Sequence, residues 1–401
     1  MCTLSNDEFI LLDELIYLEW DAYDNESVKE LVLDILNDDN LQILMDKMSN
    51  CVVSSTKEEW EKILQLILTK DNLTKLTITN VENHKSGMRT ATFTDLDGNI
   101  IVVFRGTTSV KEWEDNGQGA YEYDTEQQIY ALNYVNSINS NKIIVTGHSK
   151  GGNKAQYTTV LCPKVIKCIS INGQGFSNEF IKKYKNLIDK NKSKIIAVNS
   201  KYDYVNCLLH SIAGESHYIK TSFQVNPLFY HKGIVMLDYD GNLRDETSRS
   251  IFSKIINDFS TSLVSDLPDD LKSLTIDGLI SGIEAVLCKK QSSDRIIKII
   301  GSILILMTYG HYFKVKETFA LSYMVIQFLI IPLFFWADFI NIEETHSKEL
   351  LKDVLGKMKK SADVIFKKIK LCEDSKNPIS RNLYEKFSNF MIKLENAQES
   401  L

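Results

Sequence analysis

The pentapeptide Gly147-His148-Ser149-Lys150-Gly151 places a serine between two glycines. The residues before it are apolar and β-branched, and the residues after it favour a helix, so we expect a sharp strand-to-helix turn at this point. Such a turn holds the serine in a strained conformation and projects its hydroxyl from the edge of a sheet. Side chains beside it would clash, which explains Gly147 and Gly151. The pattern predicts that Ser149 is a nucleophile; the alternative is a glycine-rich turn in which a serine occurs by chance.

A serine nucleophile needs donors for the oxyanion that forms when it attacks a carbonyl. The backbone N–H of Lys150 opens the expected helix and points to where that charge would develop. A second donor is expected after the strand that ends at Phe104, where Gly106 allows a sharp turn and Thr107 offers its N–H. One such donor typically contributes about 10²–10³ in rate. The alternative is an ordinary strand-terminating turn.

The remaining catalytic groups should follow in the order serine, acid, histidine. Asp203 comes directly after an expected strand, at the end where catalytic groups gather in parallel sheets, and we interpret it as the orienting acid. His231 lies in the loop before a further expected strand and is the favoured base, with His217 as runner-up. His210, in an apolar stretch that is expected to be helical, and His311 and His346 are the other candidate histidines. The alternatives are a surface aspartate and structural histidines. His148 is expected to pack beneath the turn.

The elements that must position these groups alternate between strands and helices. Residues 88–94 and 100–104 form an expected hairpin around Asp95–Asn99, a turn pattern that recurs at Asp238–Asn242 and lacks the ligands of a calcium loop. Three apolar strands then alternate with helices: strands 142–146, 165–171 and 194–199, and helices 125–138, 151–161 and 177–190. Further strands are expected at 217–223 and 233–237. This alternation predicts a mostly parallel sheet with helices on both faces.

Residues 4–70 are expected to be helical, and the first sixty residues are strongly acidic, with 15 Asp or Glu against 3 Lys or Arg. We interpret this as a solvated acidic helix face.

The whole chain carries a net charge of −7, which argues against a nucleic-acid partner. Seven scattered cysteines without zinc-type spacing indicate reduced thiols and no metal site. The N-terminus lacks a basic and apolar leader, so we expect a cytoplasmic protein that is not secreted by a cleaved signal.

The region 246–401 is expected to be all-helical and contains an apolar pair of segments at about 299–337. Residues 318–337 are uncharged over 20 positions, enough to span about 30 Å as a helix, and residues 299–313 are uncharged over 15. Two interpretations remain open. One is a hairpin inserted into the membrane from the cytoplasmic side, with lysines flanking it; the other is a buried hairpin of a soluble helical subdomain.

The run Val102-Val103-Phe104-Arg105-Gly106-Thr107-Thr108-Ser109, the sequence Glu112–Asp115, and Gly147-His148-Ser149-Lys150-Gly151-Gly152-Asn153-Lys154-Ala155 together resemble class 3 lipases of the α/β-hydrolase group. They resemble even more closely a bacterial family of uncharacterised lipase-like α/β hydrolases, from the N-terminal helices to about residue 245. The resemblance implies hydrolysis of an ester, above all of a lipid, with Thr107 as an oxyanion donor. Lys150 departs from the class, which has an apolar residue there; its ammonium would favour anionic substrates or be solvated, and we favour the solvated interpretation.

The sequence therefore predicts an α/β-hydrolase-type fold in residues 1–245, followed by a helical region in residues 246–401. The predicted function is a serine esterase or lipase that forms an acyl-enzyme on Ser149, needs no cofactor and acts on a lipid or other acyl ester. Two alternatives are a catalytically silent fold used for binding, and a thioesterase or peptidase with the same triad. Oligomeric state and acyl specificity are not indicated.

Overall fold

The chain was analysed as a computed structural model, which describes most of residues 4–265 and the C-terminal helices. The described residues are 4–21, 25–37, 39–48, 55–108, 119, 122–207, 209–222, 224, 227–265, 267, 272, 325–326, 328–329, 331–332, 335–371 and 378–399. The chain divides into two compact units. The first comprises residues 1–206, 210–222 and 228–248; the second comprises residues 207–209, 223–227 and 249–401. The predicted division into domains 1–245 and 246–401 stays a prediction.

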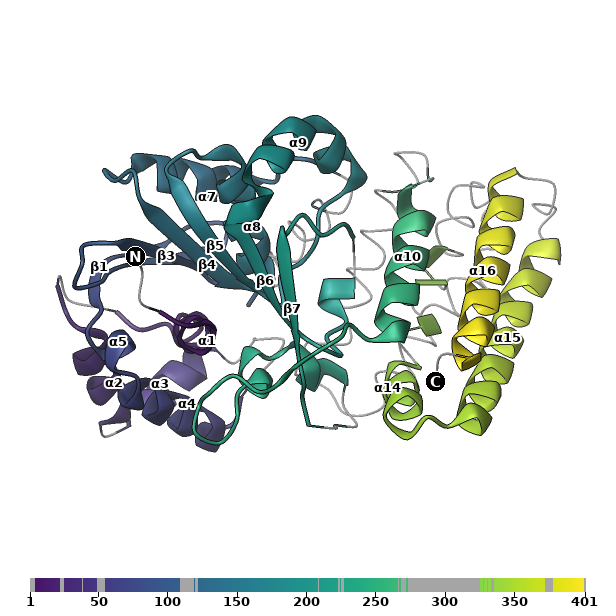
Figure 1. Ribbon diagram of the computed structural model, residues 1–401, viewed down its shortest axis with the longest axis horizontal. Helices are drawn as coiled ribbons and strands as arrows, with labels where there is room; N and C mark the ends of the chain where they lie inside the picture. The colour runs from purple at the N-terminus through teal and green to yellow at the C-terminus, as the bar shows by residue number, and fades with distance from the viewer. Residues whose placement is uncertain are drawn as a thin grey trace. The chain divides into compact units, whose positions relative to one another are not determined.

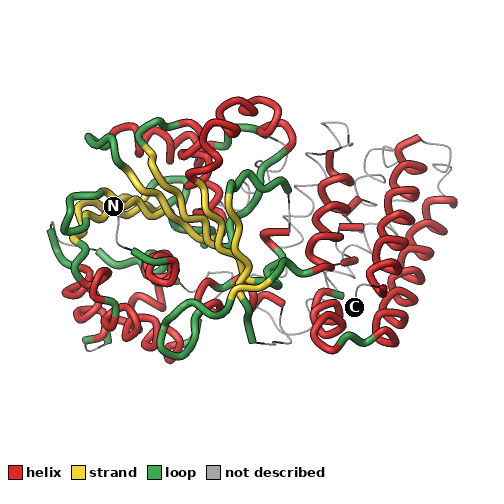
Figure 2. Tube along the Cα trace, in the orientation of Figure 1, coloured by secondary structure: helices red, strands yellow, loops and turns green. Residues whose placement is uncertain are grey.

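The first unit is built on one sheet of eight strands whose spatial order is the order of the sequence (Figures 1 and 2). The strands are β1 (Thr77–Asn83), β2 (Arg89–Thr94), β3 (Ile100–Phe104), β4 (Ile143–His148), β5 (Val165–Ile171), β6 (Ile195–Ser200), β7 (Glu215–Ile219) and β8 (Glu246–Thr247). Strands β3 to β7 run parallel, whereas β1, β2 and β8 add antiparallel pairs at the two edges. The chain has the mostly parallel sheet of an α/β-hydrolase-like fold.

The sequential strand order decides which helices cover which face. Crossover connections between parallel strands are right-handed, so connections that all step in the same direction lie on the same face. The crossover helices are α7 (Glu126–Ser137), α8 (Lys150–Leu161) and α9 (Asn178–Asn191). The other face is covered by the N-terminal helices α1 (Asn6–Leu15), α2 (Val28–Leu36), α3 (Asn40–Lys47), α4 (Lys57–Thr69) and α5 (Asp71–Thr74) (Figure 1).

Alternation along the strands divides the buried side chains between two cores. In β3, Ile101 and Val103 pack with the N-terminal helices, whereas Val102 and Phe104 pack with the crossover helices. The same alternation in β4 turns Thr146 toward the N-terminal helices, where its hydroxyl donates to Asp13 Oδ2 at 2.9 Å. His148, two residues later, points to the same side, where Tyr17, just after α1, contacts it.

Most predicted strands are present, and two predictions are wrong. Residues 233–237 do not form a strand: Gly233–Met236 is the 3₁₀ helix η4, because the N–H of Ile234 donates to Glu14 of α1 at 3.1 Å instead of to a neighbouring strand. His210 does not lie in a helix, since it forms a β-bridge with Phe176. Strands β1 and β8 had not been predicted.

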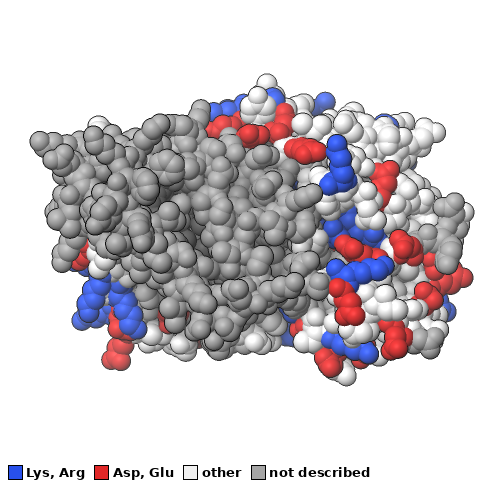
Figure 3. All heavy atoms as spheres, turned by 180° about the vertical axis from the view of Figure 1, so that it is seen from behind, with Lys and Arg blue, Asp and Glu red and all other residues white. Residues whose placement is uncertain are grey.

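The acidity of the N-terminal segment is only partly on the surface. The described part of the face in Figure 3 shows Lys and Arg interspersed with Asp and Glu. Asp13 and Glu14, however, are 1% and 8% exposed, because α1 is buried against the sheet. Burial raises the pKa of both carboxyl groups. The interpretation of a solvated acidic face is therefore wrong for these two residues.

The described part of the second unit is helical. Its helices are α10 (Ile251–Ser265), α14 (Trp336–Thr345), α15 (Lys348–Leu371) and α16 (Pro378–Asn396). Helix α15 buries Leu351, Val354, Met358 and Ala362, which recur at spacings of three and four residues. Most of the apolar segment 299–337 lies outside the described residues. None of the described helices combines the length and apolar character needed to cross a membrane.

Candidate active site

Ser149 joins β4 to α8 in a backbone conformation that residues other than glycine rarely adopt. Its φ is 59° and its ψ is −124°, and its side chain does not cap the helix that it begins. A Cβ on Gly147 would lie 2.4 Å from the backbone carbon of Gly151, and a Cβ on Gly151 would lie 2.0 Å from the carbonyl oxygen of Phe104. The turn therefore packs so tightly against the end of β3 that neither glycine could carry a side chain without a shift of the backbone.

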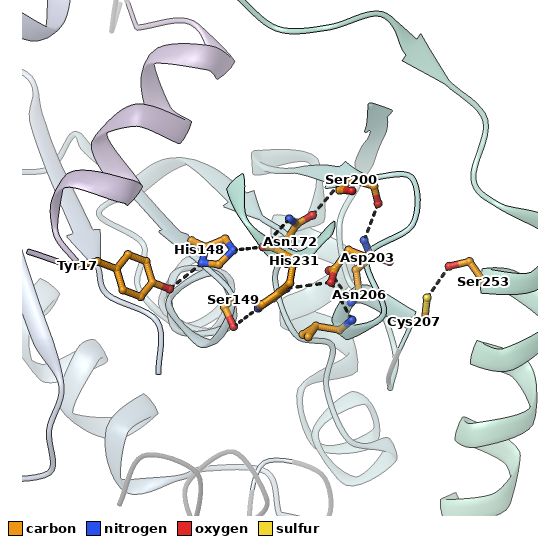
Figure 4. Close-up of polar contacts among 11 residues, drawn as sticks. Tyr17, His148, Ser149, Asn172, Ser200, Asp203, Asn206, Cys207, His231 and Ser253 are labelled. Atoms are coloured by element: carbon orange, nitrogen blue, oxygen red, sulfur yellow. Dashed lines mark hydrogen bonds and ion pairs between the residues drawn. The ribbon is translucent and has the colours of Figure 1, made fainter. Parts of the chain in front are cut away.

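The structure brings Ser149, His231 and Asp203 together (Figure 4). Ser149 Oγ lies 2.8 Å from His231 Nε2, and His231 Nδ1 lies 2.9 Å from Asp203 Oδ1. Asp203 is fully buried and His231 is 6% exposed. Since a carboxylate only accepts, Nδ1 carries the proton and Nε2 is left to accept from the serine hydroxyl. This tautomer is the one that a general base needs.

The carboxylate of Asp203 is held by its own turn. Oδ1 accepts from the N–H of Val205 at 3.0 Å, and Oδ2 accepts from the N–H of Asn206 at 3.1 Å. These two bonds fix the orientation of the carboxylate toward His231.

His148 does more than pack beneath the turn. Its Nε2 lies 2.6 Å from the carbonyl oxygen of His231, which can only accept, so Nε2 carries the proton. Its Nδ1 then accepts from the hydroxyl of Tyr17 at 2.7 Å. Burial, followed by the charge of His231, lowers the pKa of His148 to about 3. His148 is thus neutral at physiological pH and has a defined tautomer.

Asn172 connects the acid-bearing and histidine-bearing turns. It is fully buried directly after β5, with a φ of 45°. Its Nδ2 donates to the carbonyl of His231 at 3.1 Å, and its Oδ1 accepts from the N–H of Ser200 at 2.7 Å. Sequence reasoning missed this residue; the one available signal was an asparagine at a strand end, where the left-handed conformation is tolerated.

The predicted oxyanion loop lies against the serine turn. A Cβ on Gly106 would lie 3.2 Å from Ser149 Cβ, and the half-buried Thr107 follows it.

Lys150 is the first residue of α8. Its side chain is 1% exposed, so the solvated interpretation of this lysine is wrong: the side chain is buried, with its ammonium next to Gly119. Glu112–Asp115 lies outside the described residues.

The other candidate histidines are placed elsewhere. His217 in β7 pairs with Glu215 and Glu246, and His210 lies in the bridge to Phe176. His346 ends α14, whereas the position of His311 is not described. Among the described residues, no cluster of His, Cys, Asp and Glu could hold a metal ion. Of the histidines considered, the structure brings His231 to Ser149.

Comparison with known proteins gives a family match and a weak structural likeness to a lipase. The model of the Mbeg1-like family matches residues 72–279, just over half of the chain. No curated protein matches the sequence. Among solved structures, the crystal structure of M37 lipase is similar at 16% identity with a TM-score of 0.28, over 43% of this chain and 70% of that one.

Proposed function

Because this chain belongs to the Mbeg1-like family and has the fold and side-chain geometry described above, we propose that it is a serine hydrolase that cleaves carboxylic esters. The observation that carries this proposal is the hydrogen-bonded series from Ser149 Oγ through His231 to the buried Asp203, at 2.8 and 2.9 Å. The backbone strain at Ser149 supports it further, since such strain persists where the surroundings impose it and clusters at active sites.

The proposed reaction passes through an acyl-enzyme. His231 Nε2 removes the proton from Ser149 as its oxygen attacks the ester carbonyl, and Asp203 stabilises the imidazolium that forms. The backbone N–H groups of Lys150 and Thr107 stabilise the tetrahedral oxyanion. His231 then protonates the leaving alcohol, and an activated water molecule cleaves the acyl-enzyme. These groups are all present in the chain, so the steps need no cofactor.

The finer proposal is a lipid ester substrate. It is supported by the resemblance of the residues around Gly106 and Ser149 to class 3 lipases. Because the side chain of Lys150 is buried, it would not meet an anionic substrate directly, and the proposal does not depend on its charge.

Hydrolysis of p-nitrophenyl esters of increasing acyl length, with a thioester for comparison, tests the proposal. We expect the wild type to hydrolyse an ester, and Ser149→Ala and Asp203→Asn to lower kcat by about 10³-fold or more. A preference for long acyl chains would support a lipid substrate, and a preference for the thioester would point to a thioesterase. Hydrolysis by the wild type at only the uncatalysed rate would indicate a catalytically silent fold, whereas equal catalysed rates for the wild type and Ser149→Ala would show that another group is the nucleophile.

A further inference from the structure

Three residues on a short N-terminal segment contact three parts of the candidate site. Glu14 reaches the turn that carries His231, Tyr17 reaches the residue beside Ser149, and Glu19 reaches the loop before Thr107. We propose that Glu14, Tyr17 and Glu19, which we call the N-terminal brace, are positioning residues that hold these parts in register. The inference rests on the proposed function. The brace lies outside residues 72–279, the part of the chain that the family model matches.

Tyr17 makes the central contact of the brace. Its hydroxyl donates to His148 Nδ1 at 2.7 Å, and His148 Nε2 donates to the carbonyl of His231 at 2.6 Å (Figure 4). A Cβ on Gly106 would lie 2.1 Å from the same hydroxyl. The Tyr17 hydroxyl thus lies between the oxyanion loop and the residue that supports the proposed base.

The direction of these bonds explains why a hydroxyl is needed. With Tyr17 donating, the lone pair of neutral His148 stays on Nδ1 and the proton stays on Nε2. Without that donor, the buried Nδ1 of His148 loses its hydrogen bond from Tyr17, which is costly for a buried acceptor. The imidazole would then shift toward another donor, and the carbonyl of His231, which is bonded to its Nε2, would move with it. The bond from His231 to Ser149 would lengthen as a result.

The two glutamates contact the turn that carries His231 and the loop before Thr107. Glu14 Oε1 accepts from the N–H of Ile234, three residues after His231, at 3.1 Å. Glu19 pairs with Arg105 at 2.9 Å, while Arg105 also donates to the carbonyl of Gly87 at 2.7 Å. The Glu19 side chain is 43% exposed, so this pair is screened by solvent and contributes less than the buried contact of Glu14.

Tyr17→Phe removes only the hydroxyl, and Tyr134→Phe is the matched control. Tyr17 is partly buried and Tyr134 on α7 is buried, and both hydroxyl groups are hydrogen-bonded. The Tyr134 hydroxyl lies 2.5 Å from Thr92 Oγ1 and 3.0 Å from Asn80 Nδ2, but its side chain packs in the core on the opposite face of the sheet. The two variants therefore lose similar bonds at different places.

The measurement is the rate of labelling by an alkyl fluorophosphonate, separated into the maximal rate and the probe concentration at half saturation. For Tyr17→Phe we expect the maximal rate to fall by about tenfold or more with unchanged half-saturation, because misplacement affects the attack and not the binding of the probe. Tyr134→Phe should label like the wild type. In a His148→Leu background, Tyr17→Phe should have little further effect, since both act through the same bonds.

A second readout does not depend on turnover. The low-field proton NMR signal of His231 Nδ1–H, identified by its loss in His231→Ala, should shift or broaden in Tyr17→Phe and stay unchanged in Tyr134→Phe. If the wild type is labelled and both tyrosine variants match it in rate and signal, the brace is overturned while the proposed function stands. If the wild type is not labelled at all, the proposed function fails and the brace fails with it.

Discussion

The beginnings of α8 and α9 show two opposite uses of a serine at a helix N-terminus. Ser177 precedes α9 with extended backbone angles, φ −64° and ψ 159°, and its hydroxyl accepts from the N–H of Phe180. Ser149 precedes α8 with a φ of 59°, and its hydroxyl bonds to His231 instead of its own helix. The first serine stabilises its helix. Ser149 does not cap its helix, and its hydroxyl instead faces the imidazole of His231. This is the difference expected between a serine with a structural role and one with a catalytic role.

Removing the hydroxyl of Ser149 should have the largest effect and tests directly whether Ser149 and Ser177 have different roles. Ser149→Ala should lower esterase activity by about 10³-fold or more, while the free energy of unfolding changes by less than about 1 kcal/mol, because no helix cap is lost. Activity assays and urea unfolding on the same preparation measure both quantities. Full activity, or a large loss of stability, would show that Ser149 is a structural serine like Ser177.

The next largest effect concerns the packing of the serine turn. Gly151→Ala should destabilise the protein by roughly 2–4 kcal/mol, because the added Cβ would lie 2.0 Å from the carbonyl oxygen of Phe104. The control is Gly356→Ala in α15, where a Cβ meets nothing within 4 Å and a gain of about 0.5–1 kcal/mol is expected from helix propensity. Thermal unfolding compares the two variants; similar effects would contradict the tight packing.

The pH dependence of stability tests the buried state of His148. Its pKa falls from 6.5 to about 3 on folding, so below pH 6.5 the unfolded state binds more protons and stability is lost as the pH falls. Relative to His148→Gln, the wild type should lose up to about 1.4 kcal/mol of unfolding free energy per pH unit below that point. Using the difference between two proteins cancels the opposite contribution of Asp13, whose raised pKa favours the folded state at low pH. Parallel curves would mean that His148 is solvated or protonated.

The smallest effect is expected at Ser177. Ser177→Ala should cost about 1 kcal/mol of stability, the usual value of a lost N-cap, and leave the rate of ester hydrolysis unchanged. Denaturant unfolding and the same esterase assay measure both. Loss of activity without loss of stability would reverse the roles assigned to the two serines.

Local patterns predicted much of the fold because the strands that matter are short and apolar and the turns carry glycine. Strand β5 has the predicted bounds, Val165–Ile171, and the hairpin around Asp95–Asn99 is formed by β2 and β3. The glycine-flanked motif, the expected strand ends and the chain order together selected Ser149, Asp203 and His231, which the structure brings within hydrogen-bond distance; their catalytic role stays a prediction.

Contacts between distant segments could not be predicted from local patterns. The residue that meets His148 is Tyr17, which is 131 positions away, and Ile234 is bonded to Glu14 at a distance of 220 positions. Because of these contacts, residues 233–236 form a 3₁₀ helix where a strand was expected. Glu14, which was expected to be solvated, is a buried hydrogen-bond acceptor. The burial of Lys150 likewise depends on what covers α8, which its own sequence does not show.

The central claim is that Ser149 is a nucleophile activated by His231. The most direct test is to treat the wild type, Ser149→Ala and Ser177→Ala with a fluorophosphonate and to locate the adduct by peptide mass spectrometry. We expect one adduct, on Ser149, in the wild type and in Ser177→Ala, and none in Ser149→Ala. An adduct on another residue, or equal labelling of Ser149→Ala, would contradict it.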